Sequence, residues 1–428
     1  MTASAETWTD LYTRLGAATL PYGPALPDGT QIELAEGFDH FAVEYAALRQ
    51  RVGVMHLRQR AVLSLTGADV KDYLHRLCTQ QINALEGGAS VRAFQLDEKG
   101  RIAADMIVHH GDASTWLEMD AFDLPWVAEL IEARLFTEDV AAEDWTGRRT
   151  LLWLLGPAAA RLLTAVAGDA DAGRVGEIAR MPGTHHVLPL PLNGGATAAT
   201  TVYRWDLGQV LGLRLAVPAE HAVEIYGALL AAAGYEPGAE PDAEHAQRRR
   251  ESMRGRPIGW SAFNTVRIEE GVPWYHVDFG RDSLPAEVPG PAGIDGAVSF
   301  TKGCYLGQEV VARMKSLGHP KKLLVGLAFD TDTDTDADAD PTADTAQAPP
   351  PGDQHEVPAA GAQVLDVDDK QKVIGGLTSS TAAPLRSQSP IGLAVMRWGK
   401  HRPGTAVQVA AGGRLIPGRV VGLDELSG

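Results

Sequence analysis

The sequence has little cysteine and no long hydrophobic run. Cys78 and Cys304 are the only cysteines among 428 residues, which is too few for a disulfide framework and typical of a reducing compartment. No apolar run reaches the roughly 18 residues that a membrane-spanning helix needs. The N-terminus from Met1 to Tyr12 is polar and acidic and lacks the apolar core of a signal peptide. We therefore expect a cytoplasmic protein without a membrane partner.

Basic residues are also in deficit. The chain has 38 Lys and Arg against 55 Asp and Glu, a net charge of −17, and it remains at −10 when the seven aspartates of the stretch 330–344 are set aside. A nucleic-acid footprint needs a basic face, so no direct nucleic-acid partner is expected. One arginine cluster lacks aromatic residues, and we interpret it as a solvated helix face or a carboxylate-binding edge: Arg248, Arg249, Arg250, Arg254 and Arg256.

The length and hydrophobic patterning predict three parts. A chain of 428 residues, 45% hydrophobic and 22% charged, is long enough for two or three globular domains. We expect a first α+β unit over residues 1–145, a second α+β unit over 146–318, and a C-terminal antiparallel β-barrel over 319–428. The fold class is therefore α+β.

Periodicity supports the two α+β units. In the first, a short helix within 37–50 precedes an alternating strand at 61–65, a helix with its apolar face at 70–77, and a hairpin over 94–108. In the second, the buried-strand candidate Arg149–Leu155 leads through Gly156 and Pro157 into a helix at 158–167. Further strand candidates then precede a helix at 219–233.

Short strand candidates that are separated by glycines indicate the barrel. Leu323–Phe329 is the expected first strand, and six more candidates lie between residues 363 and 421. The tract at 330–358 alternates Thr or Ala with Asp and has too few apolar residues to fold, so we expect a disordered insertion. Its aspartate spacing lacks the glycine and glutamate of a calcium loop.

The stretch Thr301–Met314 contains the residues that are best suited to a reactive site. Cys304 stands two residues after Lys302, between Gly303 and Gly307, and ahead of a helix expected from Gln308. A thiol near a lysine and a helix N-terminus should have a lowered pKa, which favours a reactive or metal-binding thiolate. The alternative is that a lone cysteine is a small buried hydrophobe.

Other polar and aromatic residues leave two interpretations open. Arg267, on an expected helix within 259–271, is either a bidentate clamp for carboxylates or part of a buried ion pair. Tyr203 and Trp274 could stack on a planar ligand or belong to the core. The pairs His109–His110 and His185–His186 would project to opposite faces of a strand, so no metal site is expected.

The motif Lys302-Gly-Cys-Tyr-x-Gly-Gln-Glu309 resembles the signature of the YgfZ-type folate-binding proteins, which are relatives of the aminomethyltransferase (T-protein) of the glycine cleavage system. The resemblance extends over nearly the whole chain outside the acidic insertion. It implies two aminomethyltransferase-like α+β units and a C-terminal barrel around a central cleft. It also implies tetrahydrofolate as the cofactor.

Matching the family's motifs to this chain gives residue-level expectations. Arg267 and Glu269 stand at the family's later arginine and glutamate, and Asp105 matches the second of two aspartates, the first being Ala104 here. Asp105 could face the pocket or simply lie in its strand. The glutamate that binds the pterin edge in the aminomethyltransferases corresponds to Arg214, and a cation cannot accept hydrogen bonds. Standard aminomethyl transfer is therefore doubtful, and enzymatic activity is uncertain.

The resemblance implies a tetrahydrofolate-binding protein that supports iron–sulfur cluster assembly or repair, and indirectly tRNA modification, with cluster enzymes or assembly factors as partners. Cys304 would be the functional thiol, as a nucleophile or as an iron or sulfur ligand. The alternative is a folate-dependent one-carbon transferase or demethylase. The expected catalytic residues are Cys304, Lys302 and Asp105, and the expected folate-binding residues are Arg267, Glu269, Trp274, Tyr203, Gln308 and Glu309.

Overall fold

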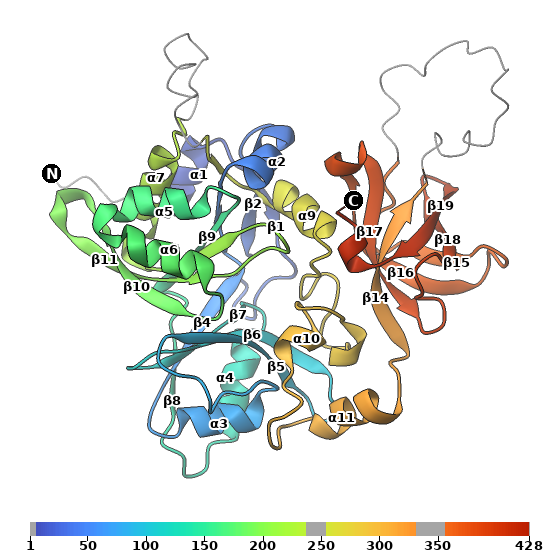
Figure 1. The fold of residues 1–428 in the computed structure, drawn as a ribbon, viewed down its shortest axis with the longest axis horizontal. Helices are drawn as coiled ribbons and strands as arrows, with labels where there is room; N and C mark the ends of the chain where they lie inside the picture. The colour runs from blue at the N-terminus through green and yellow to red at the C-terminus, as the bar shows by residue number, and fades with distance from the viewer. Residues whose placement is uncertain (1–5, 237–253, 331–355, 428) are drawn as a thin grey trace, which may run out of the picture. The chain divides into compact units, whose positions relative to one another are not determined.

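The structure is a computed structural model that describes residues 6–236, 254–330 and 356–427. The chain divides into two compact units, each built from segments far apart in the sequence. Unit 1 comprises Met1–Glu98, Ala103–Asn264 and Ala297–Leu306, and unit 2 comprises Lys99–Ile102, Thr265–Gly296 and Gly307–Gly428. Figure 1 shows the elements coloured along the chain.

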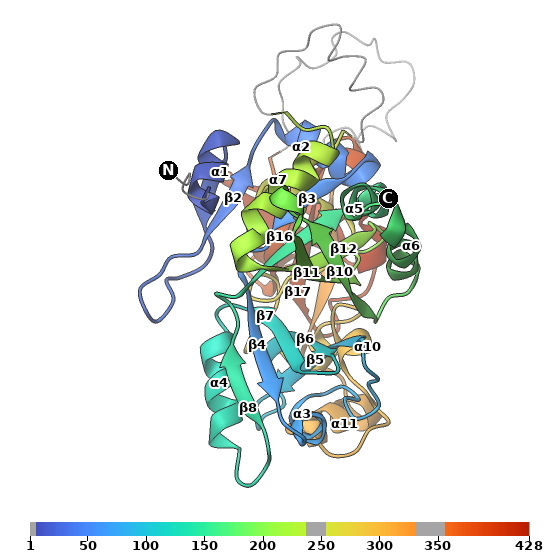
Figure 2. The same ribbon diagram turned by 90° about the vertical axis from the view of Figure 1, so that its left-hand side faces the viewer.

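A five-stranded sheet with two covering helices forms one part of unit 1. Its strands follow the order β5 (Ala89–Leu96), β6 (Ile102–His110), β7 (Thr115–Asp120), β4 (Arg60–Thr66) and β8 (Ala141–Asp144). Helices α3 (Val70–Leu77) and α4 (Leu124–Ala133) bury their apolar sides against it (Figures 1 and 2). Gly67 turns the chain into α3 with a φ of +124°, and a Cβ there would meet the backbone oxygen of Asp139 at 2.0 Å, so the turn requires glycine.

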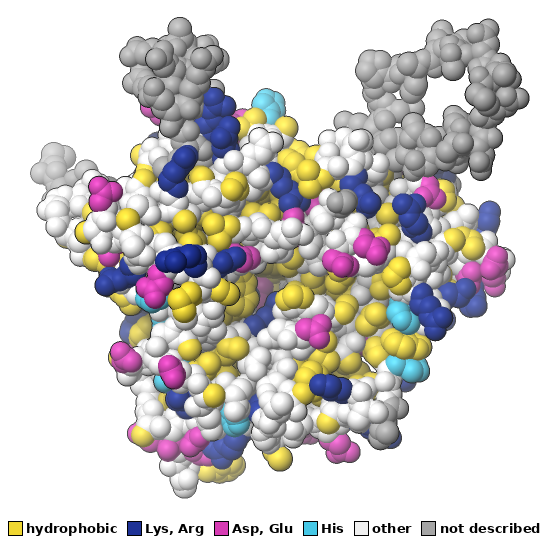
Figure 3. Space-filling view, viewed as in Figure 1, with side chains coloured by type: hydrophobic (Ala, Val, Ile, Leu, Met, Phe, Trp, Pro, Cys, Tyr) yellow, Lys and Arg dark blue, Asp and Glu magenta, His cyan; other side chains and the backbone are white. Residues whose placement is uncertain are grey.

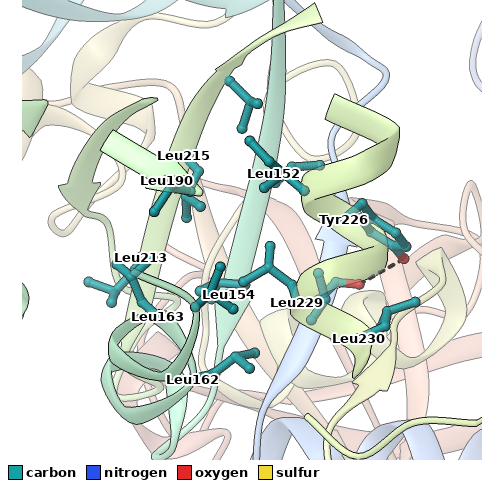
Figure 4. Close-up of a cluster of buried hydrophobic side chains, with 14 of the residues drawn as sticks. Leu152, Leu154, Leu162, Leu163, Leu190, Leu213, Leu215, Tyr226, Leu229 and Leu230 are labelled. Atoms are coloured by element: carbon teal, nitrogen blue, oxygen red, sulfur yellow. Dashed lines mark hydrogen bonds between the residues drawn. The ribbon is translucent and has the colours of Figure 1, made fainter. Parts of the chain in front are cut away.

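A six-stranded sheet forms the other part of unit 1. Its order is β10 (His185–Pro191), β11 (Thr197–Arg204), β12 (Gly212–Pro218), β9 (Arg149–Leu155), β3 (Gly53–His56) and β13 (Arg256–Pro257). Helices α5 (Ala159–Ala167), α6 (Ala172–Arg180) and α7 (Ala222–Ala232) cover it. Figure 4 shows leucines of β9 and β12 packing against α5 and α7. The Tyr226 hydroxyl of α7 donates to the backbone oxygen of Val54 at 3.2 Å.

Shorter elements complete unit 1. They are α1 (Trp8–Arg14), the paired strands β1 (Ala18–Pro21) and β2 (Glu33–Gly37), α2 (Phe41–Gln50) and the first half of α9 (Trp260–Glu269). The carboxylate of Glu44 on α2 accepts from the backbone N–H groups of Phe38, Asp39 and Gly259, which joins β2, α2 and the start of α9.

Unit 2 is centred on a closed barrel. Every neighbouring pair is antiparallel in the order β14 (Lys322–Phe329), β17 (Ser389–Arg397), β16 (Val373–Ala383), β15 (Gln363–Asp366), β18 (Ala406–Ala411) and β19 (Arg414–Val421). Valines, leucines and Phe329 fill its interior. Helices α10 (Ile294–Ala297) and α11 (Gln308–Leu317) precede it, and short 3-10 helices include Pro285–Glu287, Pro384–Arg386 and Leu423–Glu425.

The α+β class and the C-terminal antiparallel barrel are confirmed. The sheets are not purely antiparallel, since β13 pairs in parallel with β3. Sequence patterning also missed α1, α4, α6 and β7, whose amphipathic signals are short or interrupted. The Thr/Ala–Asp tract and most of the arginine cluster lie outside the described residues. Among the described residues, no helix combines the length and apolar character needed to cross a bilayer.

Candidate functional site

Cys304 lies exposed on a segment that is fixed to α3. The backbone N–H of Ser299 donates to the Thr79 oxygen at 2.9 Å, and the Thr79 hydroxyl donates to the Ala297 oxygen at 2.6 Å. Within the segment Lys302 and Tyr305 are buried, whereas Gly303 and Cys304 are exposed. The thiol therefore faces solvent at the surface of unit 1, and the alternative of a buried apolar cysteine is wrong for this residue.

Lys302 is a cap for helix α3. Its ammonium donates to the backbone oxygens of His75, Cys78 and Gln80, the last two at 2.6 and 3.0 Å. His75 lies in the last turn of α3, and Cys78 and Gln80 follow the helix. A helix leaves its last carbonyl oxygens unpaired, and its dipole favours a cation there. Burial lowers the pKa of Lys302 to about 8. All three donors are thereby used by backbone oxygens, so this lysine does not donate to the Cys304 sulfur.

The second cysteine behaves differently. Cys78 is fully buried beside the Lys302 ammonium, and its burial raises the pKa of the thiol to about 12. A thiol with that pKa stays protonated at neutral pH and is a poor nucleophile. Cys304 is therefore the thiol of the described chain that is available for chemistry.

Asp105 forms a paired contact with an arginine on the neighbouring strand. Its two oxygens accept from Arg92 Nε at 2.8 Å and Arg92 Nη2 at 2.5 Å. This fork-to-fork arrangement orients the carboxylate and balances its charge. Asp105 is 8% exposed on β6, so it is a largely buried, oriented carboxylate of unit 1.

Tyr203 belongs to a buried charged cluster that also holds Arg214. The Glu118 carboxylate on β7 accepts from the Tyr203 hydroxyl, from Arg214, and from Arg60 Nε at 3.0 Å. Burial raises the pKa of Glu118, but the two arginines outweigh that effect and hold it below its ordinary value. Sequence reasoning missed Glu118, although a glutamate within the apolar run of β7 is a signal that could have found it.

Two tryptophans complete the surroundings of this cluster. The Arg214 guanidinium carbon lies 4.1 Å from the ring centre of Trp153 and 5.5 Å from that of Trp205. Arg214 is 2% exposed. Arg214 is thus a buried cation that lies over aromatic rings and is paired with Glu118.

A serine and two histidines adjoin the Glu118 cluster. Ser90 Oγ lies 2.8 Å from His109 Nδ1 and 3.0 Å from His185 Nδ1. The His109 ring stacks on Trp116 at 3.6 Å, and its Nε2 lies 3.9 Å from Glu118. Burial lowers the pKa of both histidines, that of His185 to about 4. In the described part of the chain, no group of three or more His, Cys, Asp or Glu side chains is placed to hold a metal ion.

The remaining predicted site residues lie in unit 2. Arg267 is fully buried, and its guanidinium donates to Asp278 at 2.6 Å and to Ser379 Oγ at 2.7 Å. Of its two interpretations, this geometry favours the buried ion pair. Glu269 is also buried and accepts from the backbone N–H of Leu385 at 3.3 Å.

Three further residues of this set are more accessible. Trp274 is half-buried, and its backbone N–H donates to Asp278 at 2.8 Å. Gln308 and Glu309 form the first turn of α11, half-buried and exposed respectively. Of the nine predicted site residues, unit 1 contains Cys304, Lys302, Asp105 and Tyr203, and unit 2 contains the other five.

Comparison with known proteins gives consistent likenesses. Residues 21–302 match the family described as GCVT N-terminal domain. The aminomethyltransferase of Chlorobaculum tepidum is 25% identical over 382 residues, 88% of each chain. That of Streptomyces coelicolor is 25% identical over 416 residues, 96% of each chain. The crystal structure of glycine cleavage system aminomethyltransferase T from Bartonella henselae shares the fold, with a TM-score of 0.71 at 19% identity over 98% of this chain and 96% of that chain.

Proposed function

The chain belongs to the GCVT N-terminal domain family, and on that premise we propose that it binds a reduced folate, tetrahydrofolate, and takes part in folate-dependent one-carbon transfer. The observation that carries the proposal is the extent of the likeness to proteins named aminomethyltransferase, which spans 88% to 96% of the chain in the comparisons above. The oriented carboxylate of Asp105 supports it, because proton transfer at a folate nitrogen needs such a group.

One difference limits which folate chemistry is expected. The pterin edge presents N–H donors, and the position of the family's carboxylate is occupied by Arg214. Glu118 lies in contact with Arg214, yet its oxygens already accept from Arg214, Arg60 and Tyr203. We infer that the pterin edge is recognised by other groups, and that aminomethyl transfer itself is slower than in a standard aminomethyltransferase.

The test is a pair of measurements on the full-length chain. Anaerobic calorimetry with tetrahydrofolate measures binding. Turnover is measured as formation of methylenetetrahydrofolate from an S-aminomethyl thioether, a reaction that releases the free thiol and ammonia and needs no oxidant. Asp105→Asn keeps an oxygen for Arg92 but removes the carboxylate, and it should retain folate binding while turnover falls at least about tenfold. The matched control is Asp144→Asn, at an exposed end of β8, which should change neither quantity. Absence of folate binding in the wild-type protein would overturn the proposal.

A second function is favoured by one observation, the exposed thiol of Cys304 on its fixed segment. Under this second proposal, the chain is a YgfZ-type protein that binds tetrahydrofolate and supports iron–sulfur cluster assembly or repair, and thereby tRNA modification. Cys304 would hold iron or sulfur transiently or act as a nucleophile. Cys304→Ser should then abolish support of cluster-enzyme activity in cells while leaving folate affinity unchanged. If cluster enzymes keep full activity with this variant, the second function is refuted.

The three-part division at residues 145 and 318 and the cytoplasmic location stay predictions. The partners under the first function are folate and a one-carbon donor. Under the second they also include cluster enzymes or assembly factors.

A further inference from the structure

An exposed tryptophan lies between two histidine rings on the barrel of unit 2. Trp398 is 41% exposed and follows β17. Its ring centre lies 4.4 Å from that of His319, with planes 6° apart, and 4.2 Å from that of His401, with planes 27° apart. At the right-hand side of Figure 3, histidine side chains lie above and below a hydrophobic area, with Lys or Arg side chains beside them. We call these three rings the aromatic column.

Hydrogen bonds hold the column in place. The backbone N–H of Trp398 donates to the Lys321 oxygen at 2.8 Å, and that of Gly399 donates to His401 Nδ1 at 3.1 Å. His319 Nδ1 lies 3.1 Å from the Pro320 oxygen. Because the rings are fixed before any ligand arrives, little conformational entropy would be lost when a further ring stacks on the column.

The two segments that carry the column supply cations and no carboxylates of their own. Residues 310–323 and 397–405 contain no aspartate or glutamate. Two lysines here are neutralised from elsewhere, Lys322 by Asp282 and Lys400 by Asp366. Three exposed cations form no ion pair with any residue that the structure describes: Lys321, Arg397 and Arg402.

From this arrangement we propose that the aromatic column and its three cations form a binding surface for single-stranded nucleic acid. The exposed face of His319 continues the column, so that an unpaired base stacks on it while the cations contact neighbouring phosphates. A patch of cations alone would suit any polyanion, whereas near-parallel rings at stacking distance select a ligand with planar bases. The proposal departs from the expectation based on net charge, since that charge counts acidic residues elsewhere in the chain. It is independent of folate binding.

The test is fluorescence anisotropy of a labelled 12-nucleotide single-stranded RNA of mixed sequence, titrated with the full-length chain. With about three phosphate contacts, log K should fall with a slope near −2 against log salt, so affinity drops roughly 20-fold between 50 and 200 mM NaCl. Trp398→Ala, which removes the centre of the column, should weaken binding about tenfold. Trp398→Phe keeps a stacking ring and should stay within about twofold.

Two controls separate stacking from charge. Phe136 is 86% exposed in unit 1, and Phe136→Ala should leave RNA binding unchanged. Arg397→Glu keeps the column and should reduce both the affinity and the salt slope. If polyglutamate competes as well as RNA, or if Trp398→Ala binds like the wild type, the surface is a general anion patch and the proposal is overturned. Absence of RNA binding at 50 mM NaCl overturns it equally.

Discussion

Acid should destabilise unit 1 through His185. The structure lowers the pKa of this side chain from 6.5 to about 4, chiefly because burial disfavours the imidazolium, with further lowering by His186 and His110. The backbone of Ala89 and the Asp112 carboxylate act in the opposite direction. Since the folded pKa lies below the unfolded one, the unfolded chain binds the proton first as the pH falls. Stability present above pH 6.5 is therefore lost between pH 6.5 and about 4.

The magnitude follows from the two pKa values. At pH 5 the unfolded histidine is almost fully protonated and the folded one mostly neutral, which corresponds to a loss of about 2 kcal/mol relative to pH 7.5. His109 changes in the same direction, because its pKa is also lowered by burial and by His185, Arg214 and Arg60.

The assay compares free energies of unfolding from urea titration at pH 7.5 and pH 5, for the wild type and for His185→Asn. Asparagine can place a polar atom near the position of Nδ1, within reach of Ser90, but it does not titrate. The loss between the two pH values should be about 2 kcal/mol smaller in the variant. The comparison at pH 7.5 controls for the altered packing. Equal losses in the two proteins would show that His185 accepts a proton in the folded state, and would refute the reasoning.

Three further predictions follow from the buried contacts. Lys302→Met leaves three backbone oxygens without their donor and should lower the free energy of unfolding by about 2 kcal/mol, whereas Lys302→Arg should recover part of that loss in the same urea titration. Glu118→Gln leaves Arg60 and Arg214 uncompensated and should destabilise by about 3 to 5 kcal/mol; a melting temperature equal to the wild type's would contradict this. Iodoacetamide should label one thiol per native chain and two after denaturation, because Cys78 is buried and Cys304 exposed.

Local sequence patterns predicted more of the fold than of the candidate site. The strand expected at Arg149–Leu155 is β9, and the strand expected at Leu323–Phe329 is β14 extended by one residue, because runs of branched apolar residues report burial directly. The α4 helix was missed, since proline stands in its first turn and its apolar stripe holds only Val127 and Ile131 as buried residues. The shorter α3 was predicted because four of its eight residues form a buried apolar face, whereas two buried residues in α4 do not define such a face.

The contacts that define the site are long-range, and sequence spacing does not report them. Glu118 meets Arg214 across 96 residues, and Lys302 meets the Cys78 oxygen across 224. Every residue type carries a backbone oxygen, so the sequence does not reveal which residue serves as such an acceptor. No sequence pattern could therefore predict that Lys302 binds the end of α3. For Arg267, the buried ion pair could be named as an alternative, but its partner Asp278 could not.

The position of Lys302 predicts how little this lysine affects the alkylation rate of Cys304. An ammonium that donated to the sulfur would stabilise the thiolate and speed alkylation at neutral pH. Here the ammonium donates to three backbone oxygens at the end of α3, so Lys302 holds the segment in place and has no donor left for the sulfur. The second-order rate of iodoacetamide labelling of Cys304 at pH 7 should therefore change less than about twofold in Lys302→Arg, which keeps the charge and the anchoring role but displaces the cation. A drop of about tenfold would show that the lysine acts on the sulfur. If the rate holds, any activation of Cys304 must come from a source other than a hydrogen bond from Lys302.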